Sequence, residues 1–383
     1  MKSNVFRALA AALLMGTAAF TLTSVETATV AVAATVRAAV GNALKEAIAL
    51  AGEGKGSAAL AKVQEAQSVG NLSPSEQQAI DQTKAYIAAK TGSGATGKAK
   101  FAQDYNAGRY RDAIADAEEL RKSGGLDFQT QLIVGQAYYL SGDYSGAVRY
   151  LKGLGSSTPV LKLLVSAAFR SGDTDSMRDA LEKLVEQTND PSYWKDLLTS
   201  AGNAHGMSDR QTLDLYRLKF LTGSMKSADD YSLLAQMALQ FGVPGEAQRV
   251  EQAGDKAGVL SGEREQRLEA LTAKQAAADQ AGFANAEAAA AKAANGDAYI
   301  KLGEDYLGYG RNDDALRAIQ AGIQKGPADK DVAQMQLGRV YLALGKRDDA
   351  LRAFQQAAKS SNANQAMVAR LWTLYVRGGG GNK

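Results

Sequence analysis

Few side chains in this chain of 383 residues could carry out catalysis, because it contains one histidine and no cysteine. The histidine, His205, stands in the stretch Gly-Asn-Ala-His-Gly, which indicates a loop between two helices. A Ser-His-Asp triad would have to use this residue, and one histidine without cysteine excludes the usual zinc ligand sets. No phosphate-binding Gly-x-x-x-x-Gly-Lys-Ser/Thr loop occurs. The sequence therefore predicts no catalytic residues, no metal site and no cofactor.

Paired carboxylates are the other groups that could support acid catalysis or metal binding. The pairs are Asp229-Asp230, Asp313-Asp314 and Asp348-Asp349. Each pair stands at or near the expected start of a helix, where carboxylates cap free N–H groups and interact favourably with the helix dipole. We therefore interpret them as helix-start residues and not as catalytic acids.

A repeat between residues 296 and 362 indicates which elements position the rest of the chain. Gly310 of the first copy corresponds to Gly345 of the second, an offset of 35 residues, which is close to the period of helix-turn-helix solenoid repeats. The other shared positions are Leu302-Gly303, Tyr306 and Ala315-Leu316 in the first copy, and Leu337-Gly338, Tyr341 and Ala350-Leu351 in the second.

The spacing inside the second copy predicts two packed helices. Leu337, Gly338 and Tyr341 share one helical face, and Gly345 is expected to end that helix with a positive φ. Ala350, Phe354 and Ala357 form the inner stripe of the next helix. A glycine inside a helix costs roughly 1 kcal/mol against alanine, so we expect Gly338 to allow close approach of the neighbouring helix.

These residues are those of the tetratricopeptide repeat (TPR), and the segment resembles that family. Gln334 and Asn362 depart from its pattern in the second copy, where an aromatic residue and a proline are expected. The stretch from Tyr193 to Gly258 also looks like a family of exported bacterial TPR proteins of unassigned role. The resemblance implies an all-α fold, a right-handed α-solenoid of TPR-like helix-turn-helix repeats.

Turn signals and weaker repeats divide the chain into six predicted segments. They are a signal peptide over 1–34, an N-terminal array of degenerate TPR-like repeats over 36–260, an Ala-rich helical connector over 261–295, two well-formed repeats over 296–362, a capping helix over 363–377 and a disordered tail over 378–383. We expect the connector to be one long helix or two, hinged at Gly282. It either continues the superhelix or fills the groove of the array.

The first 34 residues have the organisation of a secretory signal peptide. Lys2 and Arg7 precede an apolar stretch, and Ala31-Val32-Ala33 fits a cleavage site. The alternative is an uncleaved membrane anchor, which the weak hydrophobicity of the stretch disfavours. We expect the protein to be exported to the periplasm, or outside the cell, of a bacterium, and to be stable through packing alone because it has no disulfides.

Binding is the chemistry that a helical array supports, because the first helix of each repeat lines its concave face. Repeat geometry predicts that ten side chains point into a groove: Gln129, Leu132, Gln136, Tyr139, Ile300, Glu304, Leu307, Met335, Arg339 and Leu342. We expect a non-catalytic scaffold that binds a protein or peptide partner of the cell envelope. The alternative for these residues is that they are only solvated or packed.

Two other functions have less support in the sequence: nucleic-acid binding and glycan hydrolysis. The net charge of +3 shows no footprint of nucleic-acid binding. A helical-hairpin enzyme acting on glycan or peptidoglycan would need two carboxylates about 5–10 Å apart in a cleft, with aromatic side chains to stack on sugars. The chain has only two tryptophans, Trp194 and Trp372, and both suit packing roles.

Overall fold

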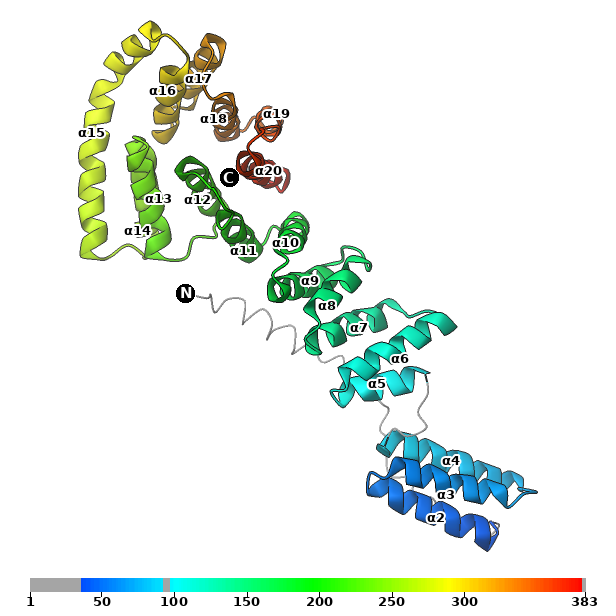
Figure 1. Ribbon diagram of the computed structural model, residues 1–383. Helices are drawn as coiled ribbons and strands as arrows, with labels where there is room; N and C mark the ends of the chain where they lie inside the picture. Colours follow the sequence, from blue (N-terminus) through cyan, green and yellow to red (C-terminus); the bar gives the residue numbers. More distant parts are fainter. Residues whose placement is uncertain (1–35, 92–96, 381–383) are drawn as a thin grey trace. The chain divides into compact units, whose positions relative to one another are not determined.

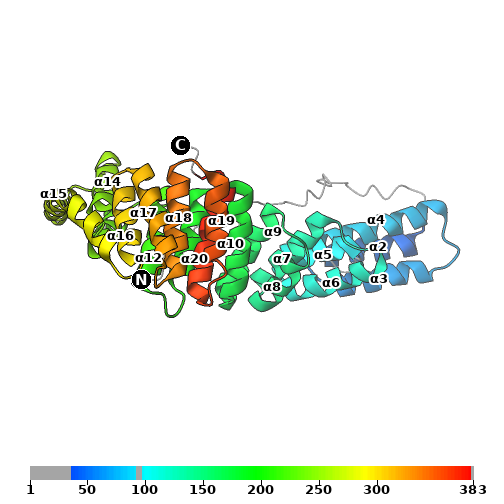
Figure 2. The ribbon, with the colours of Figure 1, turned by 90° about the horizontal axis from the view of Figure 1, so that it is seen from above.

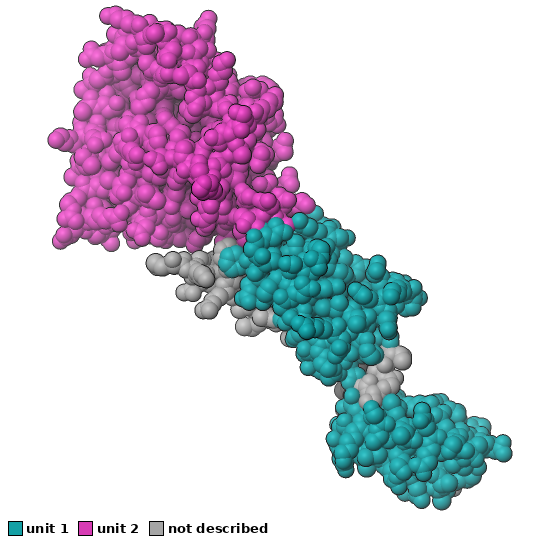
Figure 3. All heavy atoms as spheres, in the orientation of Figure 1, with its two compact units in different colours: residues 1–173 teal, residues 174–383 magenta. Residues whose placement is uncertain are grey.

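The computed structural model describes residues 36–91 and 97–380, and every regular element within these ranges is an α-helix (Figure 1). The predicted all-α fold is confirmed. The chain divides into two compact units, residues 1–173 and 174–383 (Figure 3), so the boundary falls inside the predicted array of 36–260. The predicted signal peptide lies outside the described residues. None of the helices in the described ranges is both long and apolar enough to cross a membrane.

Unit 1 begins with three helices that pack against one another: α2 (Ala38–Gly52), α3 (Gly56–Ser68) and α4 (Pro74–Thr91). Their shared core contains Leu44, Val63 and Ile80, all fully buried. The start of α4 is fixed by Ser73 and Glu76. The backbone N–H of Ser73 donates to Glu76 Oε2 (2.8 Å), and the N–H of Glu76 donates to Ser73 Oγ (3.2 Å).

Five further helices follow in unit 1: α5 (Gly97–Asn106), α6 (Tyr110–Ser123), α7 (Phe128–Leu140), α8 (Tyr144–Lys152) and α9 (Thr158–Ser171). Each packs against the next in the chain, and α7 also packs against α9. Gly108, Gly142 and Gly172 stand in the turns that follow α5, α7 and α9, and all three have positive φ.

Unit 2 contains eleven helices among its described residues. They are α10 (Thr174–Thr188), α11 (Pro191–Gly202), α12 (Asp209–Leu221), α13 (Ala228–Gln240), α14 (Pro244–Lys256), α15 (Glu263–Lys292), α16 (Asp297–Gly308), α17 (Asn312–Lys325), α18 (Lys330–Ala343), α19 (Arg347–Ala357) and α20 (Ala363–Arg377).

The two predicted repeats are the helix pairs α16–α17 and α18–α19. Gly345, which ends the first helix of the second pair, has φ +72°, as predicted. A Cβ atom on Gly303 would lie 2.4 Å from Ile319, and one on Gly338 would lie 2.5 Å from Phe354. The glycines are therefore required by the close approach of the paired helices.

The connector is one continuous helix, α15, of 30 residues. It runs through Gly282 without interruption, so of the two predicted alternatives the single long helix is the one observed and the hinged pair is not. Figure 1 shows α15 along the edge of unit 2, where it packs against α13, α14 and α16. Its few buried side chains face these neighbours: Leu268, Thr272, Ala276 and Ala290.

The predicted capping helix is α20. It packs against α18 and α19, as expected of a cap, but also against α10 and α12 (Figures 1 and 2). Contacts from α12 through α13, α14, α16, α18 and α20 back to α12 therefore form a closed ring. The predicted tail is partly ordered: the N–H of Gly380 donates to the carbonyl of Tyr375 (3.0 Å). Residues 381–383 lie outside the described residues.

Candidate functional site

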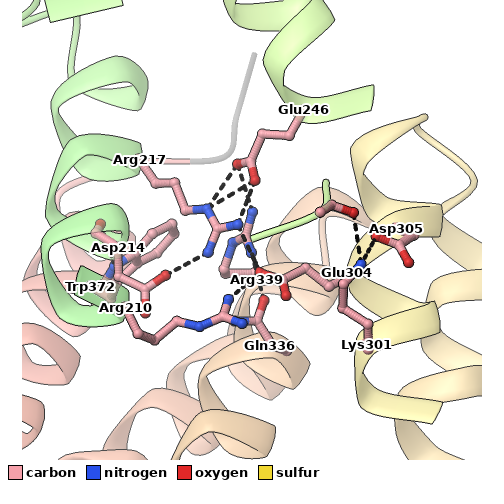
Figure 4. Close-up of polar contacts among 11 residues, drawn as sticks. Arg210, Asp214, Arg217, Glu246, Lys301, Glu304, Asp305, Gln336, Arg339 and Trp372 are labelled. Carbon is pink, nitrogen blue, oxygen red and sulfur yellow. Dashed lines mark hydrogen bonds and ion pairs between the residues drawn. The ribbon is translucent and has the colours of Figure 1, made fainter. Parts of the chain in front are cut away.

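The helices of the ring direct charged side chains into its centre (Figure 4). Arg217 on α12 donates to Asp214 (2.8 Å), to Glu246 on α14 (2.9 Å) and to Glu304 on α16 (2.8 Å). Arg339 on α18 donates to Glu246 (2.9 Å). Arg210 adds a further ion pair to Glu304 (2.5 Å). We call these six residues the central charge cluster.

Burial and charge act in opposite directions on the carboxyl groups of the cluster. Glu304 is 2% exposed and Arg217 is 2% exposed, so neither meets bulk water. Burial alone would raise the pKa of Glu246 and of Glu304. The charges of Arg217 and Arg339 outweigh it and lower both pKa values to about 2. Burial and the neighbouring Arg217 lower the pKa of Arg339 to about 10, so it too stays charged.

This arrangement does not resemble a pair of glycosidase carboxyl groups. A general acid must hold a proton near neutral pH, which requires a raised pKa. Glu246 and Glu304 are held in the ionised form by arginine, and both accept hydrogen bonds from Arg217. The geometry suits a structural role, because an unpaired charge in a dry interior would be strongly destabilising and each charge here has an oppositely charged partner.

The six predicted groove residues of unit 2 all face away from solvent. Glu304 and Arg339 belong to the central charge cluster. Leu307 and Leu342 line a cavity of about 770 Å³ beside it. Met335 and Ile300 are buried among apolar neighbours. The structure thus brings four of the six to the centre of the ring, around the central charge cluster and the cavity beside it.

In unit 1, by contrast, the predicted groove residues are accessible. On α7, Gln129 is exposed, while Leu132, Gln136 and Tyr139 are half-buried. The hydroxyl of Tyr105 on α5 donates to Gln136 Oε1 (3.1 Å). Helical spacing places Tyr139 on the same face as Gln136.

The row of side chains continues from Tyr139 to α8 and α9. The ring of Tyr139 meets that of Tyr144 edge to face, with 5.3 Å between centroids. The guanidinium of Arg170 lies 4.8 Å from the Tyr144 ring and donates to its hydroxyl (2.7 Å). We call this set the aromatic row: Tyr105, Gln136, Tyr139, Tyr144 and Arg170.

Sequence reasoning missed three members of this row. No sequence pattern assigned a role to Tyr105 or to Tyr144, which is the first residue of α8. Arg170 gave no signal in the repeat pattern. Tyr139 and Tyr144 flank the same turn, Tyr139 near the end of one helix and Tyr144 at the start of the next. A search for an aromatic residue at the start of the helix that follows Tyr139 would therefore have found Tyr144.

The residues first considered for catalysis have structural positions. His205 lies in the loop between α11 and α12, as predicted, and its carbonyl accepts from Asn364 Nδ2 (3.0 Å). The acidic pairs lie in the first turns of α13, α17 and α19, which confirms their helix-start position. They do not cap α17 or α19, where no side chain caps the N-terminus. Within the described ranges, no group of three or more His, Cys, Asp or Glu is suited to a metal ion.

Comparisons with known proteins return similar structures only. Neither a family model nor a curated protein matches the chain. A structure of Naa15/Naa10 bound to HypK-THB is 14% identical over 87% of this chain, with a TM-score of 0.31; this chain spans 55% of its length. A tetratricopeptide repeat protein from Parabacteroides merdae is 9% identical over 87% of this chain and 98% of that one, with a TM-score of 0.21.

A third structure is the pentatricopeptide repeat protein PPR10 in complex with an 18-nt RNA element. It is 14% identical over 88% of this chain and 61% of that one, with a TM-score of 0.20. The class of this protein follows from its own helix pairs and from the Leu-Gly, Tyr and Ala positions that pack them. Within the described ranges the chain has the fold of a TPR-like helical repeat protein.

Proposed function

We propose that the protein is a non-catalytic scaffold that binds a protein partner through the aromatic row of unit 1. The observation that supports this is the accessibility of the row. Its five side chains come from α5, α7, α8 and α9, and they are connected by the contacts already described. The six predicted groove residues of unit 2 are buried, whereas Arg170 of the row is exposed and its other four side chains are half-buried.

The chemistry of the row suits a peptide segment. Tyrosine gives a large contact area at low conformational cost, and its hydroxyl can still bond to the partner. Gln136 uses Oε1 to accept from Tyr105, which leaves its amide N–H groups for a peptide carbonyl. Arg170 is exposed and can meet a carboxylate while it stacks on Tyr144. A protein partner therefore fits this surface better than a nucleic-acid backbone does, since the row contains a single cation.

Variants of the row test this function. Gln136→Ala combined with Tyr139→Ala removes the centre of the row, while the exposed α8 pair Arg149→Ala and Lys152→Ala is the matched control. Partners captured by the wild-type protein from cell-envelope extracts are identified by mass spectrometry. A partner retained by the control and lost with the row variant supports the proposal. No specific partner, or one bound equally by both variants, refutes it.

The location of that partner is a second part of the proposal. We infer export across the inner membrane from the charged, apolar and Ala-x-Ala segments of residues 1–34. Cell fractionation of a tagged full-length chain, followed by N-terminal sequencing of the purified protein, tests it. A new N-terminus next to Ala33 or Ala34 in the periplasmic fraction is the expected result. Full-length protein confined to the cytoplasm would be incompatible with it.

A further inference from the structure

The cavity of unit 2 is large enough for a small organic molecule. Its volume is about 770 Å³, within the range of roughly 300–1,000 Å³ typical of ligand pockets. It lies on the axis of the ring, and its wall includes residues from α12, α14, α16, α18 and α20. None of the predicted roles of the chain accounts for it.

Most of the wall is apolar and comes from helices far apart in the sequence. The principal apolar side chains are Phe220, Leu234, Val250, Leu307, Leu342 and Trp372. Trp372 is held in place by a hydrogen bond from its Nε1 to the carbonyl of Asp214 (3.2 Å) and by packing against Phe354. The wall is therefore preformed, which lowers the entropic cost of binding.

The charged groups of the wall differ in whether they are already paired. Arg217, Arg339 and Glu246 line the cavity but belong to the central charge cluster, where each has an ion-pair partner. Arg249 on α14 also lines the cavity, is exposed and makes no ion pair within the described part of the chain. The wall thus offers one free guanidinium beside an apolar interior.

From this combination we propose that the cavity binds an amphipathic organic acid. The apolar body of the ligand lies between Phe220, Val250 and Trp372, and its carboxylate pairs with Arg249. The floor formed by the central charge cluster accepts no further ion, because its charges are mutually paired. The C-terminal ends of α12 and α18, whose carbonyl groups favour cations, also line the cavity. The positive charge of Arg249 opposes this preference for cations and makes the cavity favour an anion.

Calorimetric titration of the full chain with three matched ligands tests whether the cavity prefers an anionic, a neutral or a cationic ligand. Decanoate, decanamide and decylamine share an alkyl body and differ in charge. We expect decanoate to bind most tightly and decylamine most weakly. Tightest binding of decylamine would show that the helix ends dominate, and it would overturn the proposal. Absence of binding for all three would overturn it as well.

Two substitutions locate the ligand. Arg249→Gln removes the free cation and should weaken decanoate roughly three- to tenfold, while decanamide binding is unchanged. Arg267→Gln, on the exposed face of α15, is the matched control and should change neither. Ala343→Trp, at an exposed position of the cavity wall, should weaken all three ligands by narrowing the space. Decanoate binding that is insensitive to both Arg249→Gln and Ala343→Trp would place the ligand elsewhere and refute the proposed site.

Discussion

The two units are built from related helix pairs but differ in how deeply their ion pairs are buried. In the described part of unit 1 every ion pair keeps a solvent-accessible cation: Lys98 and its partner Asp127 are both more than half exposed, and Arg37, which pairs with the buried Glu76, has a side chain that is 45% exposed. In unit 2 the Arg217–Glu304 pair is almost completely buried. The difference follows from α20, which meets α10 and α12 and closes the ring.

Closure changes what an inward-facing residue experiences. On an open array, a charged side chain on the first helix of a repeat stays solvated and is free to meet a partner. Once the array closes, the same position loses water, and an unpaired charge there would be prohibitively unfavourable. The cluster of three arginines and three carboxylates satisfies that requirement. The comparison therefore predicts that charge matters much more for the stability of unit 2 than for that of unit 1.

The largest expected effect is that of Arg217→Met. It leaves Asp214, Glu246 and Glu304 with fewer partners in a dry site, so we expect a loss of roughly 3–5 kcal/mol in the free energy of unfolding of unit 2. Urea unfolding followed by tryptophan fluorescence measures it, because both tryptophans, Trp194 and Trp372, belong to unit 2.

The matched control for that variant is Arg109→Met in unit 1. Arg109 pairs with Asp104 from a side chain that is 48% exposed, so its loss should cost less than about 1 kcal/mol. Far-UV circular dichroism, which reports helices in both units, follows it. Equal costs for the two variants would remove the distinction between the units.

A smaller effect is expected when glycines at helix contacts are replaced. In unit 2 a Cβ on Gly338 would meet the ring of Phe354 at 2.5 Å, and that ring is packed against Trp372. In unit 1 a Cβ on Gly135 would meet the end of the Leu151 side chain at 2.6 Å and that of Leu163 at 3.5 Å. Gly338→Ala should cost roughly 1–3 kcal/mol, whereas Gly135→Ala should be nearly neutral, since a leucine end can rotate away. Thermal unfolding of both variants compares them.

The pH dependence of unit 2 gives a further, smaller test. Burial, aided by nearby Glu269 and Asp255, raises the pKa of Glu251 from 4.5 to about 7, although Thr272 donates a hydrogen bond to it. The folded state keeps this proton between pH 4.5 and 7 while the unfolded state loses it, so stability falls as pH rises through that interval. Glu251→Gln should remove this fall and add roughly 1–2 kcal/mol at pH 8. Urea unfolding at pH 5 and pH 8 measures the fall in stability and the gain in the variant. If stability falls with pH as steeply in the variant as in the wild type, Glu251 is not the group responsible.

Salt should produce the smallest change. At 1 M ionic strength the screening length is about 3 Å, so exposed pairs such as Lys98–Asp127 weaken while the buried cluster is hardly affected. We expect a shift of less than about 1 kcal/mol in either unit, arising from exposed pairs such as Lys98–Asp127 and Arg267–Glu263 and not from the buried cluster. Amide hydrogen exchange resolved by peptide separates the units. Faster exchange in α12 and α18 than in α5 and α7 on adding salt would run against this expectation.

The helices were predictable because their signals are local. Periodic apolar residues, the turn glycines such as Gly310 and Gly345, and the Ser73-Pro74 start of α4 are all read within one or two turns of chain. Gly282 left the choice between one helix and a hinged pair open in the sequence; the helix continues because a cost of about 1 kcal/mol for one glycine is small in a helix of 30 residues that packs on three others.

The candidate site was predictable only in part. Repeat geometry correctly identified Glu304 and Arg339 as inward-facing, and it found Gln136 and Tyr139 of the aromatic row. It could not reveal that α20 returns to α12, since that contact joins residues about 150 positions apart, as in the bond from Trp372 to Asp214. Beyond Asp214 on its own helix, Arg217 finds its partners on α14 and α16, and no local pattern could have indicated those two.

The return of α20 also bears on how the chain is made. A ribosome releases the N-terminal helices first, and unit 1 can assemble as each of its helices emerges, because every one packs against a near neighbour in sequence. Unit 2 cannot finish in this way. Its final helix is synthesised after all the others, so Arg217, Glu246 and Glu304 remain hydrated on the nascent chain until translation has passed Arg377. The sealing of that interior therefore waits for α20, the last of the ring helices in chain order.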